Sequence, residues 1–352
     1  MTHTTTHPFD REILFAPRTS DFCYDVFVHG AWVASARYQG AGDLIADEVC
    51  QAQDWFRTHW QSMPPCPRGK SRSTGGVMEY ERTLISVLNY GGGWQTTGLL
   101  VLIKQGKLPR PNRIIISDTG REKSSTWRYL NNVARPQMAE IGIEIEIAPR
   151  SLAYVDLYGH NGDLLLPVYT ATGKLSAFCS DEWKAQVVRR YLKLGALGFS
   201  SDQIAEMSHA TVKEHMKRRI DETFLNWIGF TYDERQRIKN TDGRCFPLVE
   251  MMLTKADIRS IIRAAGWPDP VSSACWMCAN LDNAEWRYIR GNDPADFEAA
   301  CLIDEEVREN DVFRGGTGVW LHHSRVPLRQ ADLEVEDRKG PSRQCGLGLC
   351  ML

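Results

Sequence analysis

Residues 83–97 read TLISVLNYGGGWQTT, and this stretch decides the fold. The apolar run up to Tyr90 predicts a buried strand, Gly91–Gly93 a tight turn, and the residues from Trp94 the start of a helix. Glycine lets the backbone approach a ligand closely, and the free N–H groups of a helix N-terminus favour phosphate. The stretch has neither the lysine of a Walker loop nor the G-x-G-x-x-G order. It therefore predicts an anion-binding turn formed by Gly91, Gly92, Gly93, Gln95, Thr96 and Thr97, with a purely structural turn as the alternative.

The chain after this turn alternates between strands and helices. Strands are expected at 84–90, 113–117, 143–148 and 226–231, and helices at 96–105 and 124–141. This alternation predicts an α/β fold with a Rossmann-like open parallel sheet and right-handed crossovers. Ligands of such sheets lie beyond the carboxyl ends of the strands, where Gly91–Gly93 and Asp118–Gly120 both fall. Two strand ends therefore point at one crevice.

Composition limits the domain organisation and the kind of protein. The 352 residues carry a net charge of −2, and 43% of them are hydrophobic, which excludes a disordered tail or a generally basic nucleic-acid binder. No run of 18 apolar residues occurs, so a cytoplasmic protein with no membrane partner is expected.

We expect a small N-terminal α+β module at 1–61, with strands at 24–29 and 31–38 and a helix at 43–60. A linker at 62–82, a nucleotide-binding domain at 83–253 and a helical region at 254–352 follow.

The cysteines predict a second site. Ten cysteines are too few for a disulfide scaffold in a chain of this length, whereas the Cys275-x-x-Cys278 spacing lets two thiolates reach one metal ion. The tail QCGLGLC at 344–350 adds Cys345 and Cys350, which can serve either as further ligands or as a mobile redox pair. All-sulfur ligation suits an iron–sulfur cluster or zinc. Five further cysteines are interpreted as small buried apolar residues: Cys23, Cys50, Cys66, Cys245 and Cys301.

Five motifs in order resemble one family. They are YGGGWQTT at 90–97, ISDTGRE at 116–122, FCSDEWK at 178–184, WIGF at 227–230 with DERQR at 233–237, and SSACWMC at 272–278 with Glu285-Trp286 behind it. Together they are similar to the PP-loop ATP pyrophosphatase superfamily, in its phosphoadenosine phosphosulfate reductase-like branch. The resemblance covers about residues 83–330. The family loop usually reads Ser-Gly-Gly-x-Asp-Ser, whereas Gly91 and Gln95 occupy the serine and aspartate positions in this chain.

The resemblance implies roles for named residues. It implies ATP, or phosphoadenosine phosphosulfate, with Mg²⁺ at the glycine turn, and it places Asp118 and Thr119 at the ribose or the metal ion. It implies Cys179 as a third ligand beside Cys275 and Cys278, with Cys345 as a candidate fourth ligand of a 4Fe–4S cluster or of zinc. Catalytic candidates are Lys184 and Arg237, whose cations suit phosphate or sulfate oxygens, and Cys350 as a thiol nucleophile.

The segment 195–224 is expected to be a helical insertion. Lys213, Lys217, Arg218 and Arg219 form a basic helix after a capped one, loosely like a helix-turn-helix reader. A DNA or RNA substrate is one interpretation. A solvated surface helix is the other.

Three functions remain open from the sequence. The first is adenylation of an acceptor by ATP, followed by sulfur transfer from a donor protein onto a nucleic acid or a small molecule. The second is a thiol-dependent phosphoadenosine phosphosulfate reductase that uses a thiol reductant. The third is a component that senses nucleotide or binds nucleic acid without catalysis, which the neutral Gln95 favours because an amide replaces a carboxylate poorly near Mg²⁺.

Overall fold

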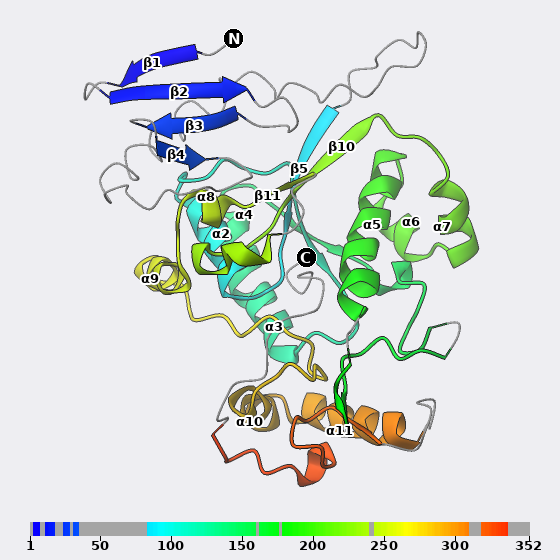
Figure 1. Cartoon of the computed structure of the whole chain (residues 1–352). Coiled ribbons are helices and arrows are strands. Elements are labelled where there is room, and N and C mark those ends of the chain that lie inside the picture. Colours follow the sequence, from blue (N-terminus) through cyan, green and yellow to red (C-terminus); the bar gives the residue numbers. More distant parts are fainter. Residues whose placement is uncertain are drawn as a thin grey trace.

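A parallel sheet of five strands forms the centre of the molecule. The computed structural model describes residues 83–159, 162–175, 178–238, 243–309 and 318–336, together with the backbone of four strands before residue 35. The sheet has the order β11-β10-β5-β6-β7, and every neighbouring pair is parallel (Figure 1). Its strands are β5 (Thr83–Asn89), β6 (Arg113–Ser117), β7 (Ile145–Ala148), β10 (Glu222–Trp227) and β11 (Arg244–Cys245). The Rossmann-like α/β prediction is confirmed.

The strand order places a switch point beside β5. The chain adds β6 and β7 on one side of β5 and then returns to add β10 and β11 on the other side. In open α/β sheets of this kind, the crevice for a ligand opens at the carboxyl ends of the two strands that flank the reversal. The glycine turn follows β5, and Gly229 follows β10, so both border this crevice.

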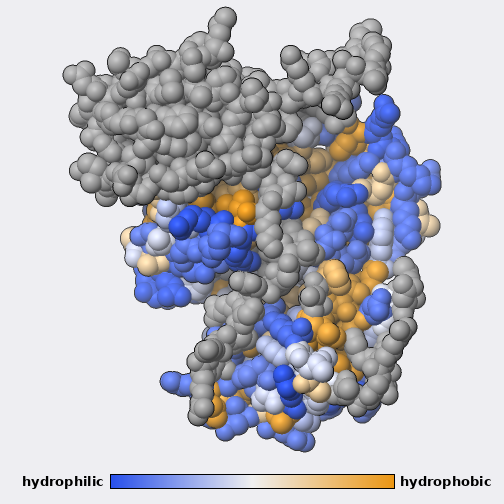
Figure 2. Space-filling model, viewed as in Figure 1, coloured by the Kyte–Doolittle hydropathy of each residue, from blue (hydrophilic) through white to orange (hydrophobic). Residues whose placement is uncertain are grey.

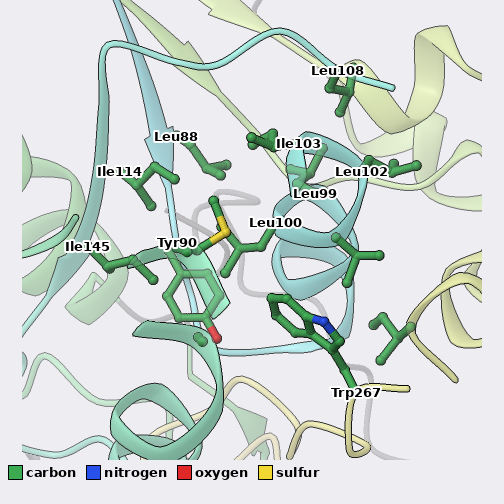
Figure 3. Close-up of a cluster of buried hydrophobic side chains, with 14 of the residues drawn as sticks. Leu88, Tyr90, Leu99, Leu100, Leu102, Ile103, Leu108, Ile114, Ile145 and Trp267 are labelled. Carbon is green, nitrogen blue, oxygen red and sulfur yellow. The ribbon is translucent and has the colours of Figure 1, made fainter. Parts of the chain in front are cut away.

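Period-two alternation along the strands divides the apolar side chains between two faces. On one face, Leu88 and Ile114 pack with helices α2 (Trp94–Lys104), α4 (Arg135–Ala139) and α9 (Lys255–Ala264), as Figure 3 shows. On the other face, Val87 and Ile115 pack with α5 (Gln186–Ala196), α6 (Ser201–Ala205) and α7 (His209–His215). Covering both faces with helices explains why the central strands β5 and β6 carry apolar residues on both of their faces.

A third layer lies below the sheet in Figure 1 and has its own core. It contains α10 (Asn283–Asn292), α11 (Pro294–Glu309) and a small antiparallel sheet of β12 (Val319–Trp320), β8 (Tyr169–Thr170) and β9 (Gly173–Lys174). The buried carboxylate of Asp304 accepts the backbone N–H groups of Leu321 and Leu328, both at 2.8 Å. This one side chain therefore ties α11 to the segment after it.

Short elements connect these layers. They are α3 (Ser124–Tyr129), the π-helical turns η2 (Leu130–Ala134) and η4 (Asp181–Ala185), the 3-10 turns η3 (Arg150–Leu152), η5 (Tyr232–Arg237) and η6 (Leu328–Gln330), and α8 (Pro247–Glu250). The N-terminal strands are β1 (His3–His7), β2 (Arg11–Pro17), β3 (Tyr24–Val28) and β4 (Ala31–Ala34). The helix expected at 43–60 and the linker at 62–82 lie outside the described residues.

Two expectations about the elements differ from the structure. The strand expected at 226–231 is β10 at Glu222–Trp227, because its first residues pair with the start of β5 although they form no apolar run. Arg235 and Arg237 consequently lie in a 3-10 turn, not on an extended strand. The C-terminal region also contributes a strand, β12, to the small sheet. In the described part of the chain, no helix combines the length and apolar character needed to cross a membrane.

Candidate functional site

The glycine turn opens onto an uncapped helix. Gly92 has a φ of +71°, a left-handed conformation that favours glycine, and the hydroxyl of Thr96 accepts the Gly91 N–H at 3.2 Å. Gly93 is the N-cap of α2, with no side-chain cap and no acidic residue in the first turn. The first N–H groups of α2 are thus left for an external acceptor such as an anion.

Helix α3, after the next strand, differs from α2 in this respect. Its first amide, that of Ser124, donates to Asp296 Oδ2 at 2.6 Å, and the Ser125 N–H donates to Asp293 Oδ2 at 3.3 Å. The protein's own carboxylates therefore occupy that N-terminus. Of these two helices that follow the central strands, α2 is the one that can receive an anion.

Across the switch point, the turn after β10 brings a buried carboxylate to the start of α2. A Cβ atom added to Gly229 would lie 2.9 Å from Thr96 Cγ2, so the two segments touch. Beyond this contact, Glu234 Oε2 accepts hydrogen bonds from Gln95 Nε2 at 3.1 Å and from the Thr231 hydroxyl at 3.0 Å. Gln95 is therefore held by an acid from the opposite side of the crevice.

The same carboxylate holds two cations. Arg237 Nη1 lies 2.8 Å and Lys255 Nζ 3.1 Å from Glu234 Oε1. Burial alone would raise the pKa of Glu234, but the pairs with Lys255 and Arg237 outweigh it, so the pKa lies below its usual value. Glu234 is therefore ionised at neutral pH. The structure places the predicted Arg237 near the turn together with Glu234 of the same DERQR motif, and it adds Lys255, for which the sequence predicted no role at the site.

A segment from the third layer covers the glycine turn. The Ser273 hydroxyl donates to the Gly91 carbonyl at 2.5 Å, and a Cβ atom on Gly93 would lie 2.7 Å from Ser273 Cβ. Its neighbour Ser272 accepts a hydrogen bond from Lys123 Nζ at 2.7 Å. The glycines are therefore needed for close packing against Ser273 as well as for the turn itself.

Two residues further along, this segment reaches the thiol site. Cys275 forms an antiparallel bridge with Glu122, and its Sγ lies 4.0 Å from Glu122 Oε1 and 3.8 Å from the Thr119 hydroxyl. Lys184 Nζ pairs with Glu122 Oε1 at 2.9 Å, and both side chains are buried. Thr119 and Lys184, predicted at the nucleotide, thus contact the thiol region.

The three predicted cysteine ligands share one electrostatic environment. Cys275 interacts with both Cys278 and Cys179, and the cations of Lys184, Lys174 and Lys123 surround them. Burial raises the pKa of Cys179 to about 12 and also raises that of Cys275 and Cys278. The thiols are therefore protonated unless a metal ion displaces their protons.

The thiols do not by themselves form a ready-made metal centre. Within the described ranges, no three His, Cys, Asp or Glu side chains are arranged so that they could hold a metal ion. Cys345, the candidate fourth ligand, and Cys350, the candidate nucleophile, lie outside the described residues. The cluster and zinc alternatives both stay predictions.

Two other predicted ligand residues have internal partners. Thr97 is fully buried, and its hydroxyl lies 3.4 Å from that of Tyr90, a residue of the core that Figure 3 shows. Asp118 accepts the Gly120 N–H at 2.7 Å with one oxygen, as in an ordinary Asx turn, and remains half-buried. Asp118 lies at the end of β6, on the other side of β5 from Glu234.

The predicted basic helix is not a basic surface. Polar side chains cover α6 and α7 in Figure 2, whereas apolar ones show between these helices and the third layer. In residues 201–222, the four basic side chains are accompanied by five acidic ones: Asp202, Glu206, Glu214, Asp221 and Glu222. This segment therefore offers no net positive charge to nucleic-acid phosphates.

The contact between turn and thiol site was not predictable from spacing, because Gly91 and Ser273 lie far apart in the chain. The pair Ser272-Ser273, in the same motif as Cys275, was the available signal, since small hydroxyl residues can approach a glycine turn closely.

Comparison of the chain with protein-family models and with curated proteins gives no match.

Proposed function

We propose that the chain binds the charged end of an adenine nucleotide, ATP or an adenylated sulfur compound, at the glycine turn and reacts it beside the thiol site. One observation carries this proposal: Ser272–Cys275 runs from the switch-point turn directly to the cysteines. In a sheet of this topology, the ligand lies at the switch point. Nucleotide chemistry and sulfur chemistry therefore share one location.

The side chains at the crevice suit this ligand. The uncapped N-terminus of α2 offers N–H donors, and Arg237 and Lys255 offer two fixed cations. These groups neutralise the charge of a leaving pyrophosphate or of a leaving adenosine bisphosphate, which is the main contribution of a protein to such transfers. Together with the motif resemblance, they favour a PP-loop enzyme that adenylates an acceptor before sulfur transfer.

The alternative reaction is reductive. In a thiol-dependent phosphoadenosine phosphosulfate reductase, a thiolate would attack the sulfur atom and release the adenosine bisphosphate. Burial raises the pKa of Cys179, Cys275 and Cys278, which disfavours all three as the attacking group. The candidate nucleophile of the reductive reaction, Cys350, lies outside the described residues, so this reaction stays the second candidate. A metal ion or cluster at these thiols remains part of the proposal, and no step is derived through it.

A nucleotide titration tests the proposal. The intrinsic fluorescence of Trp94, the first residue of α2, reports on ATP or phosphoadenosine phosphosulfate at the turn. Replacing Arg237 by Gln should weaken binding about tenfold or more, the loss of one charge-assisted contact. The matched control is Arg235→Gln, because Arg235 is exposed and contacts Tyr232 instead.

Two outcomes contradict the proposal. One is the absence of binding by both nucleotides at millimolar concentration, and the other is equal affinity in the Arg237 and Arg235 variants. Product analysis then separates the reactions, because adenylation releases pyrophosphate and reduction releases sulfite.

Anaerobic purification with iron, sulfide and zinc analysis tests the metal prediction independently. Iron with labile sulfide supports the cluster, and one zinc ion in a colourless protein contradicts it.

A further inference from the structure

Glu234 is the most heavily engaged side chain at the switch point. It is 8% exposed, and its two oxygens accept from Gln95, Thr231, Arg237 and Lys255 at 2.8 to 3.1 Å. These partners come from three elements: α2, η5 with its N-cap Thr231, and the first turn of α9. A carboxylate with both oxygens occupied fixes the positions of its partners and has little capacity left for a metal ion.

The charges around Glu234 favour an anion over a cation. One carboxylate and two cations leave a net charge of +1 beside the uncapped end of α2, whose dipole adds positive potential. The first turn of α2 contains no acid, and Gln95 at its second position is neutral. A divalent cation would meet two fixed positive charges there, and the neighbouring carboxylate of Asp233 accepts the backbone N–H of Lys255 at 3.2 Å.

On the side of β6, a side chain of α3 packs directly on the turn. Thr126 is fully buried, and a Cβ atom on Gly92 would lie 2.5 Å from its methyl group, so this side chain packs directly on the turn. Its hydroxyl Oγ1 has no hydrogen-bond partner within the described part of the protein. A buried hydroxyl without a partner costs about 1 to 3 kcal/mol. Because the methyl group of Thr126 and not its hydroxyl faces Gly92, the proposal rests on the charges around Glu234 and not on this hydroxyl.

We propose that Glu234 is a positioning residue that fixes Gln95, Arg237 and Lys255 as a cation clamp, and that this clamp binds the phosphate or phosphosulfate of the nucleotide without a divalent metal ion. The inference rests on the proposed function, because it assumes a nucleotide at the turn. Fixed guanidinium and ammonium groups neutralise the anion in place of Mg²⁺.

Titrations with and without Mg²⁺ test the clamp. ATP and phosphoadenosine phosphosulfate are each titrated into the full chain in EDTA and in millimolar Mg²⁺. The expected result is that at least one of them binds in EDTA with an affinity within about threefold of that in Mg²⁺. Binding that appears only with Mg²⁺ overturns the clamp and leaves the proposed function standing. No binding under either condition overturns the proposed function itself.

Two variants test the positioning role. Glu234→Asp keeps the charge but withdraws the carboxylate by one methylene, so nucleotide affinity in EDTA should fall about tenfold. Glu222→Asp, at the opposite end of β10, is the matched control. Gln95→Asp would set a second carboxylate against Glu234, so its affinity should fall in EDTA and recover partly with Mg²⁺. The inference is overturned if Glu234→Asp or Gln95→Asp binds nucleotide in EDTA as tightly as the wild-type protein does. The Mg²⁺ dependence of Gln95→Asp is a readout that a merely structural defect would not produce.

Discussion

The buried ion pair of Glu122 and Lys184 makes the sharpest stability prediction. The side chains are 2% and 9% exposed, and their charged atoms lie 2.9 Å apart beside Cys275. Replacing Lys184 by Met leaves the Glu122 carboxylate buried and unpaired, and breaking such a pair from one side costs about 3 to 5 kcal/mol. Replacing Glu122 by Gln strands the ammonium in the same way. The double variant removes both charges, so it should lose clearly less than the sum of the single variants.

The assay is a double-mutant cycle measured by urea unfolding at pH 7. Burial lowers the pKa of Lys184, but Glu122 raises it further, so the folded-state pKa lies above the usual lysine value. The stabilisation is therefore complete below a pH of about 10.4 and is lost only as the pH rises through the folded-state pKa. We expect a coupling energy of about 2 to 3 kcal/mol. The exposed pair of Lys104 and Glu140 is the control and should give less than about 1 kcal/mol.

This reasoning would be refuted if the double variant lost as much unfolding free energy as the two single variants lose together. A loss below about 1 kcal/mol in Lys184→Met would do the same, because it would mean that water or another cation reaches Glu122 easily. In that case, the region around Cys275 would be hydrated, and the raised pKa of its thiols would lose its physical cause.

Three further changes test other parts of the structure. Asp304→Ala leaves two buried amide N–H groups without acceptors and should cost about 3 kcal/mol in urea unfolding; a loss below about 1 kcal/mol would contradict the role of this carboxylate. Because the pKa of Glu234 is lowered in the folded state, its ionised form stabilises the protein above the unfolded pKa of about 4.3, and this stabilisation is lost as the pH falls through the folded-state pKa. Glu234→Gln should therefore flatten the acid limb of a plot of stability against pH. An unchanged acid limb would contradict this contribution of Glu234. Gly93→Ala places a methyl group against Ser273 and should cost about 1 to 3 kcal/mol in thermal unfolding, with partial recovery in the Gly93→Ala, Ser273→Gly double variant; the absence of recovery would place the clash elsewhere.

Local patterns were enough to predict the central fold. The apolar runs before Tyr90 and at 113–117, each followed by a helical pattern, correspond to β5, α2, β6 and the consecutive α3, η2 and α4, with shifts of at most two residues. The start of β10 was missed because Glu222–Leu225 acquires its extended conformation by pairing with β5 and not from its own composition. The order of the strands, and with it the switch point, depends on such pairing.

The candidate site was predictable only where one motif forms one feature. The glycine turn and the Cys275-x-x-Cys278 pair are local and were recognised. The cation clamp joins Gln95 to Glu234 and Lys255. Both of these residues lie well over a hundred residues after Gln95 in the chain, and no spacing rule connects them to it. Ser273 reaches the turn from a still later segment. Such contacts are products of tertiary packing, which a single sequence does not display.

The Ser272–Cys275 segment has a thermodynamic consequence. Because Ser273 hydrogen-bonds to the turn while Cys275 bridges to Glu122, a ligand that displaces Ser273 also changes the geometry around the thiols. Thermodynamic linkage makes this coupling reciprocal. If metal loading or oxidation of the thiols changes the nucleotide affinity by some factor, nucleotide binding changes the equilibrium constant for metal binding or oxidation by the same factor. The redox or metal state of the cysteines would then be communicated to the nucleotide through four consecutive residues.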